Sequence, residues 1–152
     1  MSQVYGEFQR TNMQDKVVFA GSGKLGFPEA ALLAFGLGCD LVNVAREAML
    51  AIGCIQAQRC HTGFCPAGIA TQNKWLMRGL DPASKSARLA NYIVALRKDL
   101  LRLSRACGEN HPALVTLDHF AILDTNSHAK QAVDVFGYTD EAKRRAPPQT
   151  KS

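Results

Sequence analysis

Apolar residues near the start of the chain predict two short strands, each followed by a helix. Residues 16–20 form an apolar run ended by glycines, and residues 41–44 form a second run of the same kind. Such runs are typical of strands buried on both faces. Helices are predicted over 28–37, with a proline near the first turn, and over 46–52. This alternation with short connections predicts a parallel βαβα unit, and hence an α/β fold.

The second half of the chain contains one long amphipathic pattern. Asp81 is a candidate N-cap with Pro82 at the first helical position, and Gly108 ends the pattern. Apolar residues recur between them at spacings of three and four, which predicts a helix with one face on a core. The stripe consists of Leu89, Ile93, Leu96, Leu100, Leu103 and Cys107. Shorter helices are expected within residues 1–15 and over 117–123.

Two strands do not make a stable parallel sheet, because each strand needs neighbours and helices on both faces. The chain has 152 residues, whereas a whole (β/α)8 barrel needs about 250. We therefore expect another copy, another chain or a longer polypeptide to complete the sheet. Residues 124–152 are basic and contain a Pro147–Pro148 pair, a composition that predicts a disordered tail.

Composition narrows the class of protein. Apolar residues make up 47% and charged residues 20%, an ordinary balance for a globular protein. Part of the net charge of +5 lies in the tail, and aromatic residues are few, so no nucleic-acid partner is expected. No stretch has the length of a transmembrane helix, and the first residues lack the layout of a signal peptide. We expect a cytoplasmic protein without a membrane partner.

A glycine-rich loop over residues 21–26 lies between the first strand and the next helix. Its backbone N–H groups suit a phosphate, and Lys24 would add positive charge. The loop fits the glycine pattern of dinucleotide-binding folds, but no acidic residue ends the second strand. Ala45 and Arg46 follow that second strand, so two adjacent loops could hold one phosphate. The alternative is a tight turn, with Arg46 paired to a neighbour such as Glu47.

Three cysteines within twelve residues are the strongest chemical signal. Cys54, Cys60 and Cys65 lie in a loop that contains Gly63 and is closed by Pro66. In a reducing compartment such crowding favours a metal site over disulfides, and thiolates suit iron–sulfur clusters or zinc. Zinc would need a fourth ligand, for which His61 is available. A cluster, a zinc site and a loop of reduced thiols remain open from spacing alone. Cys39 and Cys107 are predicted to be core thiols.

With these residues assembled, the sequence resembles the C-terminal part of the FMN-binding domain of glutamate synthases. The resemblance runs from about Val4 to Leu123. Its most specific stretch contains the three cysteines, and further similar stretches are 20–24, 38–40, 45–46 and 65–72.

This resemblance implies a C-terminal fragment of a (β/α)8 TIM barrel, with the two strands as its seventh and eighth. It implies that Ser22, Gly23 and Lys24, together with Ala45 and Arg46, hold the phosphate of FMN. It also implies that Cys54, Cys60 and Cys65 bind a three-iron, four-sulfide (3Fe–4S) cluster, which removes the need for a fourth ligand. Members of this family are oxidoreductases acting on CH–NH2 donors. They reduce 2-iminoglutarate, which is made from 2-oxoglutarate and ammonia, to L-glutamate. Its electrons come from ferredoxin or a pyridine-nucleotide-linked partner.

The implied organisation divides the chain at residue 123. Residues 1–123 would be the C-terminal segment of the FMN-binding domain, and 124–152 the tail. The segment comprises the barrel strands and loops at 16–53, the iron–sulfur loop at 54–72 and a helical extension at 81–123. Strands one to six, with the catalytic substrate residues, would belong to the remainder of the barrel, so the isolated chain is expected to be inactive. A zinc-stabilised interaction module and an inactive barrel remnant are the alternatives.

Overall fold

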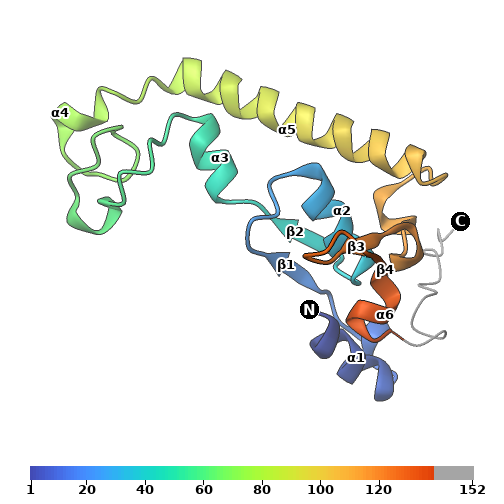
Figure 1. The fold of residues 1–152 in the computed structure, drawn as a ribbon. Helices are drawn as coiled ribbons and strands as arrows, with labels where there is room; N and C mark the ends of the chain where they lie inside the picture. The colour runs from blue at the N-terminus through green and yellow to red at the C-terminus, as the bar shows by residue number, and fades with distance from the viewer. Residues whose placement is uncertain (139–152) are drawn as a thin grey trace, which may run out of the picture.

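A computed structural model describes residues 1–138, which form a mixed α/β structure (Figure 1). Residues 54–88 form a long projecting arm, and the remaining described residues form the body. Two small sheets lie in the body of the molecule, and helix α5 runs from the arm into this body. The helices are α1 (Ser2–Arg10), α2 (Pro28–Gly36), α3 (Arg46–Ala51), α4 (Lys74–Met77), α5 (Pro82–Ala106) and α6 (Ala132–Phe136). The strands are β1 (Ala20–Ser22), β2 (Leu41–Asn43), β3 (Ala121–Leu123) and β4 (Ala129–Gln131). Short 3-10 turns are η1 (Gln14–Lys16), η2 (Cys60–Thr62), η3 (Pro112–Leu114) and η4 (Leu117–His119).

The predicted βαβα unit is present. Strands β1 and β2 pair in parallel, with Ala20 opposite Leu41 and Ser22 opposite Asn43. The first strand begins at Ala20 rather than at residue 16, and the Asp40 carboxylate accepts the N–H of Phe19 at 2.8 Å just before it. This hydrogen bond aligns the two strands at their amino ends, because Phe19 directly precedes β1 and Asp40 directly precedes β2.

Burial of the strands on both faces is not found among the described residues. Val18, next to β1, is 70% exposed, and Leu41 in β2 is 58% exposed. The β1–β2 sheet has only two strands in the described part of the chain, so no further strand pairs with its outer edges there. Apolar side chains on these strands therefore face outward, as expected of a sheet that lacks neighbours.

The core of the body surrounds α2. Ala31, Leu32 and Ala34 of this helix are buried, and α5 packs along it. The α2 helix begins as the sequence predicts, since Pro28 occupies its first turn, where a missing N–H costs no helical hydrogen bond. Cys39 is 2% exposed, which confirms it as a core thiol.

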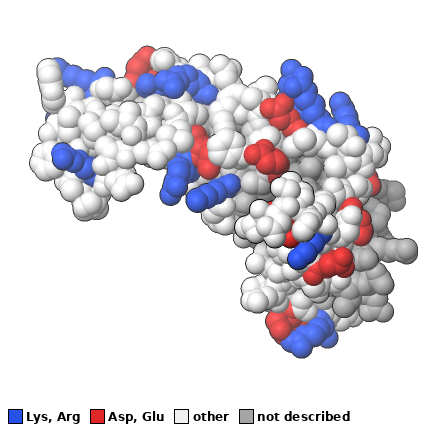
Figure 2. All heavy atoms as spheres, in the orientation of Figure 1, with Lys and Arg blue, Asp and Glu red and all other residues white. Residues whose placement is uncertain are grey.

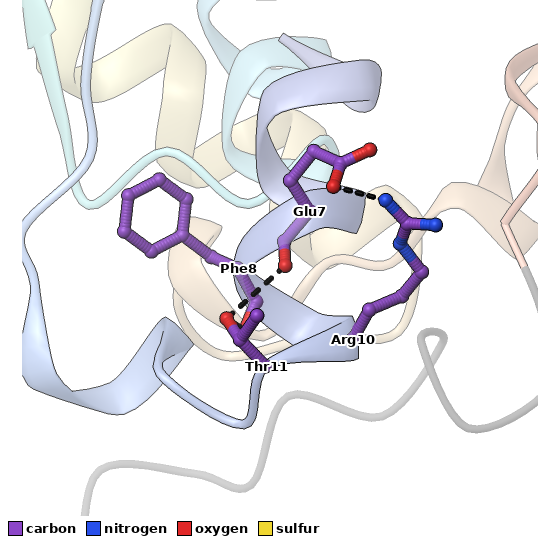
Figure 3. A network of polar contacts seen from close by, with 4 residues as sticks. All are labelled: Glu7, Phe8, Arg10 and Thr11. Atoms are coloured by element: carbon purple, nitrogen blue, oxygen red, sulfur yellow. Dashed lines mark hydrogen bonds and ion pairs between the residues drawn. The ribbon is translucent and has the colours of Figure 1, made fainter.

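Helix α1 closes one end of the body through Tyr5. The Tyr5 ring meets the Phe19 ring edge-on at 5.2 Å and stacks against Tyr138 at 6.0 Å. The helix ends in a small polar network, in which the Thr11 hydroxyl donates to the carbonyls of Glu7 and Phe8 (Figure 3). An ion pair between Arg10 and Glu7 lies on the same turn.

Helix α5 has the predicted ends. The Asp81 carboxylate accepts the N–H groups of Ala83 at 3.2 Å and Ser84 at 3.3 Å, and Gly108 follows the C-terminus with φ of +82°. The predicted apolar stripe is mostly half-buried, and Ile93 remains 48% exposed. Only part of the stripe packs on the body, because the N-terminal part of α5 belongs to the arm.

Two expectations for the C-terminal part are wrong. Residues 117–123 form η4 and strand β3 instead of a helix. Residues 124–138, expected to belong to a disordered tail, form β4 and α6, with β3 and β4 antiparallel. Their order comes from tertiary packing, because Ala132 and Val133 are buried in a cluster with Leu117. The rest of the predicted tail, 139–152, lies outside the described residues. Within the described residues, no helix is long and apolar enough to span a membrane.

Candidate functional site

The glycine loop and the loop after β2 lie at the same edge of the sheet. Because Ser22 is opposite Asn43 in a parallel pair, both strands end side by side there. The glycine loop continues from β1, and Ala45 and Arg46 continue from β2 into α3. Ser22, Gly23, Lys24, Ala45 and Arg46 are all exposed. The structure therefore brings together the two loops that the sequence separates by about twenty residues.

The glycine loop has an unusual backbone. Gly23 and Lys24 both have positive φ, +110° and +55°. A Cβ at Gly23 would meet no atom within 4 Å, so glycine is needed there for conformation rather than space. No hydrogen bond from the N–H of Gly23, Lys24 or Leu25 is found within residues 1–138. Successive free N–H groups in such a turn suit an anion.

Two side chains support this loop from behind: Tyr92, which sequence analysis missed, and Glu47, which it considered only as a partner of Arg46. Glu47 of α3 is 9% exposed, and its side chain lies where a Cβ at Gly26 would be. Tyr92 of α5 donates its hydroxyl to the carbonyl of Gly26 at 2.7 Å. Burial first, and the nearby Glu47 carboxylate second, raise the pKa of Tyr92, so the hydroxyl remains a donor. Tyr92 lies on the stripe side of α5, but a single sequence shows no signal for its contact with Gly26.

The three loop cysteines lie on the projecting arm. Cys54 follows α3 and is half-buried, Cys60 begins η2 and is exposed, and Cys65 is buried. Among residues 1–138, no group of three His, Cys, Asp or Glu side chains is placed to hold a single metal ion. The cysteines thus share one arm without meeting at one point, and His61 is exposed beside Cys60.

Backbone N–H groups surround the sulfur of Cys65. The N–H of Ala70 is the largest cause of the lowered pKa of the Cys65 thiol, and burial partly opposes this effect. The N–H groups of Ile69, Ala67 and Gly68 lower the pKa further. The N–H of Gln56 reaches the Cys54 sulfur at 3.4 Å. Such donors stabilise a thiolate, the form of cysteine that binds metals. The environment of Cys65 therefore fits soft-metal ligation at that sulfur.

The arm is held in shape by local contacts and glycines. The Thr71 hydroxyl donates to the carbonyl of Gly63, joining the end of the cysteine loop to its middle. The Thr62 hydroxyl donates to the Arg59 carbonyl at 2.8 Å, within η2. Gly68 has φ of +75°, and a Cβ there would overlap the carbonyl oxygen of Leu76 in α4. Gly68 thus allows the cysteine loop to pack against the backbone of α4.

The arm carries much of the positive charge of the chain. Residues 54–88 contain five basic side chains and one acidic one, a net charge of +4. Figure 2 shows several basic patches over the arm, with an acidic patch between two of them at its upper edge. The one carboxylate, Asp81, is engaged as the N-cap of α5. The basic residues are Arg59, Lys74, Arg78, Lys85 and Arg88.

Comparison with known proteins places this chain beside glutamate synthases. A family model described as the conserved region in glutamate synthase matches residues 1–110. Over 102 residues the chain is 43% identical to the glutamate synthase large subunit-like protein YerD of Bacillus subtilis, covering 67% of this chain and 19% of that protein. Over 98 residues it is 36% identical to the archaeal glutamate synthase (NADPH) of Methanocaldococcus jannaschii, covering 64% and 19%. Over 100 residues it is 30% identical to the ferredoxin-dependent glutamate synthase of Cyanidium caldarium, covering 66% and 6%.

The matched region contains both candidate sites and all of α5, whereas residues 111–138 lie beyond the family model. The chain spans about a fifth of the length of the first two of these relatives, at 19% each.

Proposed function

This chain belongs to the glutamate synthase family, and we propose that it supplies the FMN phosphate loops and the cluster cysteines of a glutamate synthase-type oxidoreductase. The observation that carries the proposal is the pair of loops at the carboxyl edge of β1 and β2. Ligands of parallel sheets bind at this edge. The free N–H groups at Gly23 and Lys24 would hold the phosphate oxygens, and Lys24 and Arg46 would add positive charge.

Cys54, Cys60 and Cys65 would bind the 3Fe–4S cluster. The N–H groups around Cys65 would stabilise its thiolate as a ligand.

The proposed reaction is reduction of 2-iminoglutarate, made from 2-oxoglutarate and ammonia, to L-glutamate. When bound, the flavin would supply hydride transfer and the cluster would supply one-electron transfer. The contribution of this chain would be to hold the flavin phosphate and the cluster in fixed positions. The residues that contact the substrate would belong to the remainder of the enzyme.

We propose that β1 and β2 are the seventh and eighth strands of a (β/α)8 barrel completed by further polypeptide. The two edges of this sheet that stay unpaired within residues 1–138 and the short span relative to the relatives support this. The isolated chain would then be inactive. The groove along β1, lined by Val4, Phe8, Val18 and neighbouring residues, would receive one of the missing strands.

The electron donor would dock on the arm. Its net charge of +4 favours a partner with an acidic surface, such as a ferredoxin-like carrier or the acidic face of a pyridine-nucleotide-linked subunit. One relative named above is ferredoxin-dependent and another is named for NADPH, so both donor classes occur among similar proteins.

The test is anaerobic reconstitution of the chain with iron and sulfide, followed by metal analysis and spectroscopy. We expect about three irons per chain and a 3Fe–4S signal in the electron paramagnetic resonance spectrum. Cys54→Ser, Cys60→Ser and Cys65→Ser should each abolish the signal, whereas Cys107→Ser should retain it. One zinc per chain, lost in His61→Ala, would instead establish the zinc alternative.

A further inference from the structure

Helix α5 contacts the turns that lead to both candidate sites. Tyr92 donates its hydroxyl to Gly26 at 2.7 Å, across 66 positions of sequence. Nearer the arm, the ammonium nitrogen of Lys85 lies 3.0 Å from the position that a Cβ would take at Gly53, directly before Cys54. The two contacts are seven residues apart on one helix, about 10 Å along its axis.

The contact at Gly26 is tightly constrained. Gly26 is buried, its carbonyl accepts from Tyr92, and the Glu47 side chain occupies the space beside its Cα. Glu47 is in the first turn of α3, directly after Arg46. The glycine loop, the loop after β2 and α5 therefore meet at one buried point behind the candidate phosphate site.

Little else fixes the tip of the glycine loop. Gly23 and Lys24 are exposed and have the left-handed backbone conformation, and their N–H groups have no partner within the described residues. A loop of this kind is mobile unless neighbouring contacts hold it. The Tyr92 hydroxyl, from outside the loop, donates a hydrogen bond to the carbonyl of its last residue, Gly26.

We propose that Tyr92 is a positioning residue that anchors the glycine loop to α5, so that the phosphate loop and the cysteine arm share one rigid support. This inference rests on the proposed function, in which the glycine loop binds the FMN phosphate. An ordered loop presents its N–H groups to that phosphate without an entropic cost of ordering on binding. Glu47 acts with Tyr92 by filling the space beside Gly26.

The experiment compares Tyr92→Phe with Tyr138→Phe in the full chain. Tyr138 is a matched control, because its hydroxyl also donates to a backbone carbonyl at 2.7 Å, that of Leu37, away from the glycine loop. The first measurement is the 15N backbone order parameter of residues 23–26, which needs no ligand. We expect these values to fall from about 0.85 towards 0.6 in Tyr92→Phe alone. The order parameters of Gly53 and Cys54, which lie beside α5 two helical turns from Tyr92, should stay unchanged.

The second measurement is the affinity for FMN relative to riboflavin, which differ by the phosphate. In Tyr92→Phe we expect the preference for FMN to fall about fivefold, the effect of losing one ordinary hydrogen bond. Riboflavin affinity should be unchanged.

The two measurements separate the two proposals. Equal affinity of the wild-type chain for FMN and riboflavin would count against the phosphate loop, while the order parameters would still test the anchor. The anchor is overturned if residues 23–26 stay ordered in Tyr92→Phe, or if Tyr138→Phe disorders them equally. A matching change at Gly53 and Cys54 would also overturn it, since that indicates general loosening of α5.

Discussion

Gly68→Ala should disrupt the cysteine arm far more than Gly63→Ala, although both glycines have φ of +75°. Forcing alanine into this left-handed conformation costs about 1–2 kcal/mol at either position. At Gly63 a Cβ would meet nothing within 4 Å, so no further cost arises. At Gly68 it would overlap the Leu76 carbonyl oxygen and lie 3.4 Å from the N of Leu80. Overpacking against backbone adds about 1–3 kcal/mol.

Trp75 is the only tryptophan of the chain and lies in α4, next to this contact. Urea unfolding followed by Trp75 fluorescence therefore reports on the arm directly. With a denaturant slope of about 1.5 kcal/mol/M, the midpoint of Gly68→Ala should lie roughly 0.7–2 M below that of Gly63→Ala. Equal midpoints for the two variants would refute the packing of the cysteine loop on α4.

The same comparison has a chemical readout. Gly68→Ala should displace the N–H groups of Ala67–Ala70 from the Cys65 sulfur, so the pKa of this thiol should rise. The rate of iodoacetamide labelling of Cys65, followed by mass spectrometry across a series of pH values, should then rise at a higher pH than in Gly63→Ala. An unchanged pH profile would show that these donors do not set the thiol pKa.

Three further predictions concern stability. The lowered pKa of Cys65 means that its thiolate stabilises the metal-free fold fully above the ordinary thiol pKa of about 8.5. This contribution is lost as the pH falls through the lower folded value, so the urea midpoints of wild type and Cys65→Ser should converge as the pH is lowered. Asp81→Ala should destabilise the chain by about 1 kcal/mol in urea unfolding through loss of the α5 N-cap, whereas Asp81→Asn should retain most of that stability. Gly38→Ala should lower the Tm by several degrees more than Gly108→Ala, because both have positive φ but only Gly38 faces the Tyr5 ring.

The sequence predicted correctly those helices and strands that depend on residues near to one another in the chain. The long helix begins at Pro82 behind the Asp81 cap and ends just before Gly108, because capping and left-handed glycine act within one turn. The parallel pairing of two short strands also followed from their alternation with helices. The resemblance to glutamate synthases was carried by the cysteine loop and by the stretches 20–24, 38–40, 45–46 and 65–72, and the match over residues 1–110 now shows family membership.

Tertiary structure decided what depends on distant neighbours. The sequence over 117–138 reads as a short helix and a tail, yet it forms a hairpin and α6 because Leu117, Ala132 and Val133 bury one another. The contacts of Gly26 with Glu47 and Tyr92 could be seen only in the folded chain. These residues lie 21 and 66 positions away in sequence, and no local pattern connects them to Gly26. The sequence by itself indicated candidate residues for a phosphate and for a metal. Only packing decided which of them lie together, because burial and side-chain contacts are properties of the folded chain.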